Sequence, residues 1–186
     1  MLGARWERQV LLRTIVGALT LTACHTAVPE PRVPLPASRL RLTFVPESPA
    51  FAAAAREYEQ LWAADGARIV RAMESTSGLT FRDIPMRIRA SYSRDTKKST
   101  LIHELGHRLQ QGLFRRDEEE HGPLFLWLYD VWVQLYGREF ADAQVEIEKR
   151  RRGPYPKAWD DALALSASQR ASRWRAVVAE RMPTRR

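Results

Sequence analysis

Hydrophobic and polar residues alternate in two short stretches of the chain and follow a helical period through much of the rest. Residues 40–45 and 83–93 alternate apolar with polar positions, which predicts two strands. Residues 48–75 are rich in alanine and begin with Ser48 as a candidate N-cap, which predicts a long helix. A break in this helix is expected near residues 65–66, where aspartate precedes glycine.

Helical periodicity returns at residue 99 and continues almost to the end of the chain. Residues 124–137 are apolar nearly all round, as in a helix buried at the centre of a domain, and Asp130 and Gln134 interrupt them too much for a membrane span. Because helical pieces outnumber strands, the predicted fold class is α+β with helix dominant. The predicted helical pieces are residues 48–75, 99–114, 124–137, 138–151, 157–166 and 166–182.

Composition describes an ordinary globular chain. Of the 186 residues, 45% are hydrophobic and 28% are charged, which excludes a disordered chain and suits one domain with appendages. The formal net charge is +8, but the arginines recur along the whole chain instead of forming one stripe. A solvated, arginine-rich surface accounts for this charge better than a nucleic-acid partner does, so no nucleic acid is expected.

The N-terminal residues have the pattern of a secretory signal. Arginines precede an apolar run at residues 14–23 that is too short to cross a bilayer, and the lone Cys24 follows it. The letters LTAC, which end at Cys24, resemble a bacterial lipobox. That resemblance implies that residues 1–23 are a signal peptide that is removed and that Cys24 is acylated.

A lipid on Cys24 would anchor the protein to a membrane of the bacterial cell envelope. His25 stands after the cysteine, in place of the aspartate associated with inner-membrane retention, so the outer membrane facing the periplasm is the expected location. Residues 24–39 are rich in proline and predict an extended tether, which leaves residues 40–186 as the folded domain. Because Cys24 is the only cysteine, no intrachain disulfide can form.

Three of the four histidines lie in the stretch STLIHELGHRLQQGLFRRDEEEHGPLF, residues 99–125. His103 and His107 are four residues apart, so a helix brings both to one face while its leucines gather on the other side and pack. This spacing allows two imidazoles to bind one zinc ion. Glu104, about 100° from His103 around the helix, can reach an open metal position and act as general base toward a zinc-activated water.

A catalytic zinc site needs a third protein ligand and keeps its fourth position open to water. His121 is the first candidate for the third ligand, provided that the acidic turn before it brings it back over the metal. A carboxylate from a later helix is the alternative. Glu139, Asp142 and Glu146 share one helical stripe there, although a solvated acidic face accounts for that stripe as well.

Other polar residues near this stretch have two interpretations each. Asp130 lies inside an apolar helix and needs a partner, so it either orients a ligating histidine or pairs with an arginine. Tyr129 and Tyr136 either donate a hydrogen bond to a reaction intermediate or pack in the core. The acidic turn at residues 117–120 is expected to be solvated charge.

With these residues in view, the stretch resembles the SprT-like (Spartan-type) zinc peptidases of the zincin class. Members pair His-Glu-x-x-His on one helix with a third histidine, in a His-Gly-x-x-Phe context, that opens the next helix. The matching letters are HELGH at 103–107 and HGPLF at 121–125, and the resemblance covers about residues 86–136. It implies a zincin-like fold, in which a small sheet packs on the active-site helix and a buried helix carries the third ligand. It further implies a zinc-dependent endopeptidase with one Zn²⁺ per chain, the ligands His103, His107 and His121, and catalytic Glu104.

The chain departs from that family in several ways. Family members are typically intracellular and several act on DNA-bound proteins, whereas this chain has a secretory pattern and too few cysteines for a cysteine-rich zinc module. Arg108 also follows the second ligand, where an uncharged residue is usual. The expected function is hydrolysis of protein or peptide substrates in the cell envelope, with the substrate extended along the strand at 86–92. A non-catalytic zinc-binding lipoprotein and a helical interaction protein without metal are the alternatives.

Overall fold

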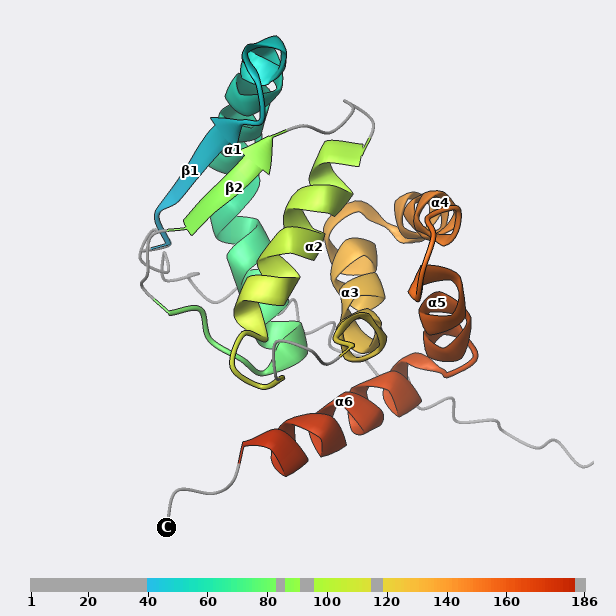
Figure 1. Cartoon of the computed structure of the whole chain (residues 1–186). Coiled ribbons are helices and arrows are strands. Elements are labelled where there is room, and N and C mark those ends of the chain that lie inside the picture. Colours follow the sequence, from blue (N-terminus) through green and yellow to red (C-terminus); the bar gives the residue numbers. More distant parts are fainter. Residues whose placement is uncertain (1–39, 83–85, 91–95, 115–118, 183–186) are drawn as a thin grey trace, which may run out of the picture. The chain divides into compact units, whose positions relative to one another are not determined.

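The computed structural model describes residues 40–82, 86–90, 96–114 and 119–182 (Figure 1). The predicted signal peptide, the lipidation site at Cys24 and the tether at 24–39 lie outside these residues, so they stay predictions. Helices dominate the described part, and the strands form one small sheet, which confirms the α+β class. The elements are β1 (Leu42–Pro46), a 3-10 helix (Pro49–Phe51), α1 (Ala52–Ser77), β2 (Met86–Ala90), α2 (Lys97–Leu109), α3 (His121–Tyr136), α4 (Arg138–Lys149), α5 (Tyr155–Leu163) and α6 (Ala167–Arg181).

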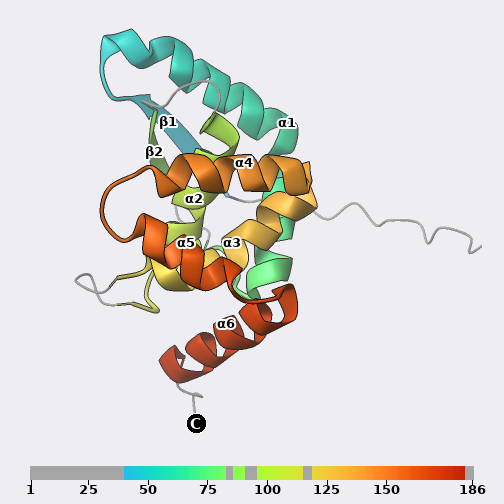
Figure 2. The same ribbon diagram turned by 90° about the vertical axis from the view of Figure 1, so that its right-hand side faces the viewer.

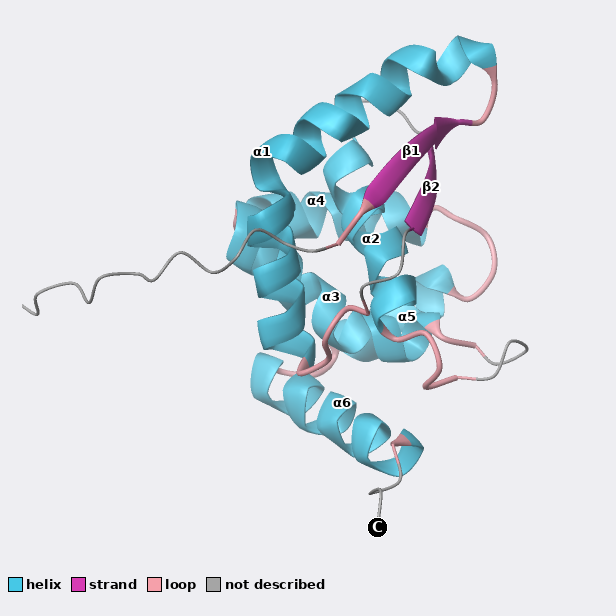
Figure 3. Ribbon diagram, turned by 90° about the vertical axis from the view of Figure 1, so that its left-hand side faces the viewer, coloured by secondary structure: helices cyan, strands magenta, loops and turns pink. Residues whose placement is uncertain are grey.

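The sheet consists of β1 and β2, which pair in parallel from Leu42 opposite Met86 to Pro46 opposite Ala90. A parallel pair needs a long connection, and α1 supplies it by running between the two strands in the chain. The sheet packs mainly on α1 (Figure 3). Phe44 of β1 stacks on Tyr58 of α1 with ring centroids 5.6 Å apart. The main support of the sheet is therefore α1, whereas the resemblance to SprT-like peptidases implied the histidine-bearing helix in that place.

Helix α1 runs without interruption to Ser77, so the break predicted near residues 65–66 is wrong. Gly66 is there because the ring of Trp62 lies against it, and a Cβ at this position would come within 2.7 Å of that ring. The helix ends at Gly78, whose φ of +70° suits a residue without a side chain. The Ser48 side chain makes no capping hydrogen bond, and Pro49 opens the 3-10 turn that leads into the helix.

The central element is α3, which contacts α1, α2, α4, α5 and α6. Helices α4 and α5 lie on the same side of it (Figure 2). This position explains why α3 is apolar nearly all round, as predicted, and the helix opens at His121, three residues before the predicted start. Its buried residues are Leu124, Phe125, Leu126, Trp127, Leu128, Tyr129, Val131, Trp132 and Leu135. Among the described residues, none of the helices combines the length and the apolar character needed to cross a membrane.

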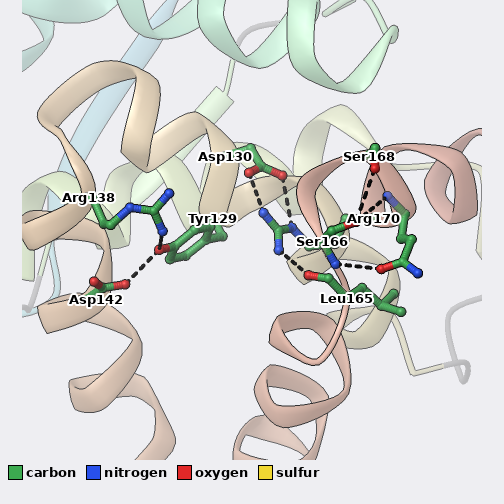
Figure 4. A network of polar contacts seen from close by, with 9 residues as sticks. Tyr129, Asp130, Arg138, Asp142, Leu165, Ser166, Ser168 and Arg170 are labelled. Carbon is green, nitrogen blue, oxygen red and sulfur yellow. Dashed lines mark hydrogen bonds and ion pairs between the residues drawn. The ribbon is translucent and has the colours of Figure 1, made fainter. Parts of the chain in front are cut away.

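Asp130 of α3 pairs with Arg170 of α6, so it does not orient a ligating histidine (Figure 4). The guanidinium donates from Nε at 3.0 Å and from Nη2 at 2.6 Å to the two carboxylate oxygens, a bidentate arrangement. Its Nη1 donates to the Leu165 carbonyl at 2.7 Å. The ion pair therefore fixes α6 on α3, and the arginine interpretation of Asp130 is the one that holds.

A glycine sets the distance between α2 and α3. A Cβ at Gly106 would lie 2.5 Å from Cδ1 of Leu124, and Leu124 is fully buried, so the two helices can approach this closely only if residue 106 has no side chain. Helix α2 ends at Leu109, earlier than the predicted Phe114, and Gly112 adopts a φ of +94° in the turn that follows. The close contact brings the first turn of α3, which carries His121, alongside the middle of α2.

Candidate metal site

Three histidines converge where α2 meets the start of α3. One ring nitrogen from each of His103, His107 and His121 can be chosen so that all three lie within 4.8 Å of one another. The Nε2 atoms of His103 and His107 are 3.0 Å apart, as expected for i and i+4 on one helix face. The His121 ring lies 4.9 Å from that of His107 and 5.5 Å from that of His103, measured between centroids. The predicted ligand set is thus brought together, close enough to bind a metal ion.

Each of these histidines also faces its own carboxylate through Nδ1. The distances are 3.0 Å from His103 to Glu148, 2.7 Å from His121 to Glu119 and 3.4 Å from His107 to Glu120. The contacts of His103 and His121 are hydrogen bonds, and since a carboxylate only accepts, they hold the proton on Nδ1 and leave the Nε2 lone pair free. Nδ1 of His107 lies near Glu120 without a hydrogen bond to it. A carboxylate behind a histidine is the usual way in which proteins orient a metal-ligating imidazole.

The donor set fits a metal ion. Two ligand nitrogens at 2.0–2.1 Å from a tetrahedral zinc ion would be about 3.3 Å apart, close to the 3.0 Å between His103 and His107. Without a cation between them, two Nε2 lone pairs would face each other in a largely buried space. A proton shared between the rings is disfavoured, because burial lowers the pKa of His107 and so does the charge of His103. Neutral imidazoles are the form that a metal binds.

Glu148 of α4 is the most enclosed of the three carboxylates, with its side chain 4% exposed. It accepts from His103 and, at 3.0 Å, from Nε1 of Trp159 in α5. One helical turn earlier, Ser99 of α2 donates to Gln144 of α4 at 2.6 Å. Two polar contacts spaced by one turn therefore hold α4 along α2 and fix the His103 ring from behind.

Glu148 was not among the residues predicted for the site. The sequence pattern that could have indicated it is the buried stripe of α4, which Glu148 shares with Ala141, Gln144 and Val145. A carboxylate on such a stripe requires a partner.

The acidic turn before α3 also belongs to the site, which corrects the expectation that it is only solvated charge. Glu119 accepts from the ring and from the backbone N–H of His121, the latter at 2.8 Å. Burial alone would raise the pKa of Glu119, but the two contacts with His121 lower it overall. The backbone carbonyl of Glu120 accepts a hydrogen bond from Gln110, which anchors the turn to the end of α2.

Glu104, the candidate general base, is half-buried on α2, directly after His103. Tyr155 is the first residue of α5. Its ring centroid lies 4.5 Å from that of His121 and 5.9 Å from that of His103, and its ring is nearly parallel to the His103 ring. Burial raises the pKa of Tyr155, Arg151 lowers it through its charge and a hydrogen bond, and the charges of Glu148 and Glu104 raise it. The charge of the Glu104 carboxylate therefore raises the pKa of Tyr155, whose ring borders the histidines. Tyr155 was not predicted for the site, because it follows a proline-bounded loop far along the chain.

The other candidates lie elsewhere. Glu139, Asp142 and Glu146 are exposed, as in the solvated interpretation, and the group of described residues that could hold a metal contains none of them. The Tyr129 hydroxyl donates to Asp142 at 2.7 Å (Figure 4), and that of Tyr136 donates to Asp65 at 3.2 Å. Both phenols are thus engaged with carboxylates outside the histidine cluster.

Comparison of the chain with protein-family models, with curated proteins and with solved structures gave no match. The residues of the site and their geometry are therefore what indicates the function.

Proposed function

We propose that this protein is a zinc-dependent endopeptidase that cuts protein or peptide substrates, with His103, His107 and His121 as ligands and Glu104 as general base. The observation that carries the proposal is that His121, at the start of α3, converges on the two histidines of a His-Glu-x-x-His helix, with a carboxylate near each of the three rings. Three imidazole ligands with a fourth position left open are typical of a catalytic zinc site. The group of described residues that could hold a metal offers no fourth carboxylate or thiolate ligand.

The resemblance to SprT-like zinc peptidases supports the same function. The letters that carry it, HELGH and HGPLF, lie on α2 and at the start of α3, and Gly106 lets these two elements approach closely. The zincin-like fold remains part of this proposal.

A bound zinc ion would polarise the scissile carbonyl and lower the pKa of water to about 7. Glu104 takes the proton of the attacking water and delivers it to the leaving amine. Burial, which lowers the pKa of His107, favours its neutral form, whereas the charge of Glu120 opposes this. The three carboxylates instead orient the imidazole rings. Glu148 does this in a buried setting, and Glu119 and Glu120 do it at the surface.

The substrate is proposed to bind as an extended segment beside β2. That strand pairs with β1 along one edge, and an extended peptide can add to the other edge of such a strand. The lipid anchor on Cys24 and a place at the outer membrane facing the periplasm complete the proposal, and both rest on the sequence of the first residues.

The direct test is the Glu104→Gln variant, which keeps the shape of the side chain and removes its basicity. Casein hydrolysis by the purified full chain is expected with zinc, is expected to stop with a chelator, and is expected to be lost in Glu104→Gln while that variant still binds one zinc ion. Glu146→Gln, at an exposed glutamate of α4 outside the cluster, is the matched control and should cleave like the unmodified protein. An active Glu104→Gln protein would rule out the assigned base.

A non-catalytic zinc-binding envelope lipoprotein is the second candidate. One observation favours it: His103 is only 2% exposed and lies under Tyr155 and Phe125, so its side of the cluster is well covered. One zinc ion per chain, with no hydrolysis of casein or of a mixed peptide library, would support this candidate over the peptidase.

A further inference from the structure

Tyr155 borders the histidine cluster and carries a polar group there. Its ring packs against His103 and His121, at centroid distances of 5.9 Å and 4.5 Å. Phe125 packs against the same two histidines at 5.9 Å and 5.7 Å, but it is fully buried and has no polar atom to offer. Tyr155 has a phenol hydroxyl and is only partly buried, so solvent reaches it where it does not reach Phe125.

The hydroxyl of Tyr155 differs from those of Tyr129 and Tyr136 in its partner. The latter two donate to the carboxylates of Asp142 and Asp65. Tyr155 instead has Arg151 beside it, with the guanidinium 5.3 Å from the centre of its ring. An arginine has no acceptor atom, so it cannot take up the phenol proton in a hydrogen bond, and that proton stays available. Among the described residues, none accepts that proton.

Amide hydrolysis needs a donor of this kind. When water adds to the carbonyl carbon, the π electrons move onto the carbonyl oxygen, and a preformed donor at that oxygen stabilises the charge. A phenol with a guanidinium behind it is a strong neutral donor, and it can make this hydrogen bond without giving up its proton. The water proton still goes to Glu104 and from there to the leaving amine, so the balance of the reaction is unchanged.

We infer that Tyr155 is a catalytic residue that donates its hydroxyl hydrogen bond to the carbonyl oxygen of the scissile amide. Arg151 is a positioning residue that holds the phenol in place. This inference rests on the proposed peptidase function, because it assigns the donor for that reaction. It also gives the α4–α5 loop, which precedes Tyr155 in the chain, a part in the site.

The test compares Tyr155→Phe with Tyr129→Phe and Tyr136→Phe, each in the zinc-loaded full chain. Removal of one such donor lowers kcat by roughly 10²–10³-fold in well-studied hydrolases. We expect a loss of this order for Tyr155→Phe, with KM within about threefold of the unmodified protein and an unchanged zinc content. The two control variants should keep their kcat. A Tyr155→Phe protein with unchanged kcat would overturn the inference, and so would one that loses zinc, because the phenol would then be a ligand.

A binding experiment separates this inference from the proposed function. A phosphinic peptide mimics the tetrahedral stage of hydrolysis, and its affinity for the zinc-loaded protein can be measured by calorimetry even if no substrate is cut. We expect Tyr155→Phe to weaken this affinity by at least tenfold and the control variants to leave it unchanged. If no substrate is cleaved but Tyr155→Phe alone weakens binding, the peptidase function fails, and what stands is that the Tyr155 hydroxyl donates to an oxygen of a ligand bound at the metal. Equal binding by Tyr155→Phe, or no binding by the unmodified protein, overturns the donor role.

Discussion

Two carboxylates of the central region, the partly exposed Asp130 and the buried Glu148, show how differently one chemical group can be used. Asp130 faces Arg170, and both of its oxygens accept from the same guanidinium (Figure 4). Glu148 faces His103 and Trp159, and each of its oxygens accepts from one ring nitrogen. Both arrangements tie helices together, α3 to α6 in the first case and α2, α4 and α5 in the second.

The difference lies in what the partner has left to offer. Apart from the bonds to Asp130, Arg170 donates to the Leu165 carbonyl and has no acceptor atom, so the pair serves only packing. His103 keeps a second ring nitrogen, and Glu148 turns that nitrogen toward His107. A buried carboxylate therefore indicates a site only when its partner has a free lone pair that points at other donors.

Among the variants of these carboxylates, Glu148→Gln is expected to have the largest effect. The amide can accept from only one of the two ring N–H groups if its NH₂ turns toward the other, which leaves a buried donor unpaired and lowers the free energy of unfolding by about 1–3 kcal/mol. The loss of the charge behind His103 should also weaken zinc binding by roughly 10–100-fold. Urea denaturation of the metal-free protein and zinc competition titrations measure the two effects. A variant with unchanged zinc affinity would show that Glu148 is as purely structural as Asp130.

Asp130→Asn is the matched change at the other carboxylate and should act on stability alone. The buried Arg170 keeps one amide oxygen but loses its counter-charge, and since the Asp130 side chain is 28% exposed, we expect a loss of about 1–2 kcal/mol in the free energy of unfolding. Zinc affinity should stay within twofold of the unmodified protein, in the same titrations. Weakened zinc binding in Asp130→Asn would contradict the division between the two carboxylates.

Glu119→Gln should have the smallest effect, which sharpens the comparison to one between buried and exposed carboxylates behind ligands. Its side chain is 53% exposed, so water can replace it behind His121, and its contribution is screened. We expect zinc affinity to fall by less than about tenfold and stability to change by less than about 0.5 kcal/mol. A loss as large as that of Glu148→Gln would show that the burial of the carboxylate does not decide its strength.

Much of the framework could be predicted from local patterns. The i, i+4 spacing placed His103 and His107 on one face, and the apolar run after residue 124 identified the central helix. The pairing of Asp130 could not be chosen from the sequence, because it depends on how α6 crosses α3, which no local pattern encodes. Local patterns also mistook Gly66 for a break, since the Trp62 ring that covers it was not considered.

The supporting residues of the site were harder to find because tertiary packing brings them in. Helix α2 was expected to present its histidines on a polar front, but α4 and α5 cover that side and bury His103. The stripe of α4 considered for metal binding was the exposed one, at Glu139, Asp142 and Glu146, whereas Glu148 lies on the opposite, buried stripe. A carboxylate on an apolar stripe is the stronger indication of a functional site, because its burial costs free energy unless a partner compensates its charge.

Zinc titration of the metal-free full chain, followed in parallel for His121→Ala, tests the central claim most directly. The claim is that His103, His107 and His121 together hold one metal ion. We predict that the unmodified protein binds one zinc ion per chain. His121→Ala is expected to bind it more weakly by more than the roughly 10–100-fold that follows loss of a residue behind a ligand. His25→Ala, at the fourth histidine, is the control and should bind like the unmodified protein. No zinc uptake by the unmodified protein, or equal uptake by His121→Ala, would contradict the claim.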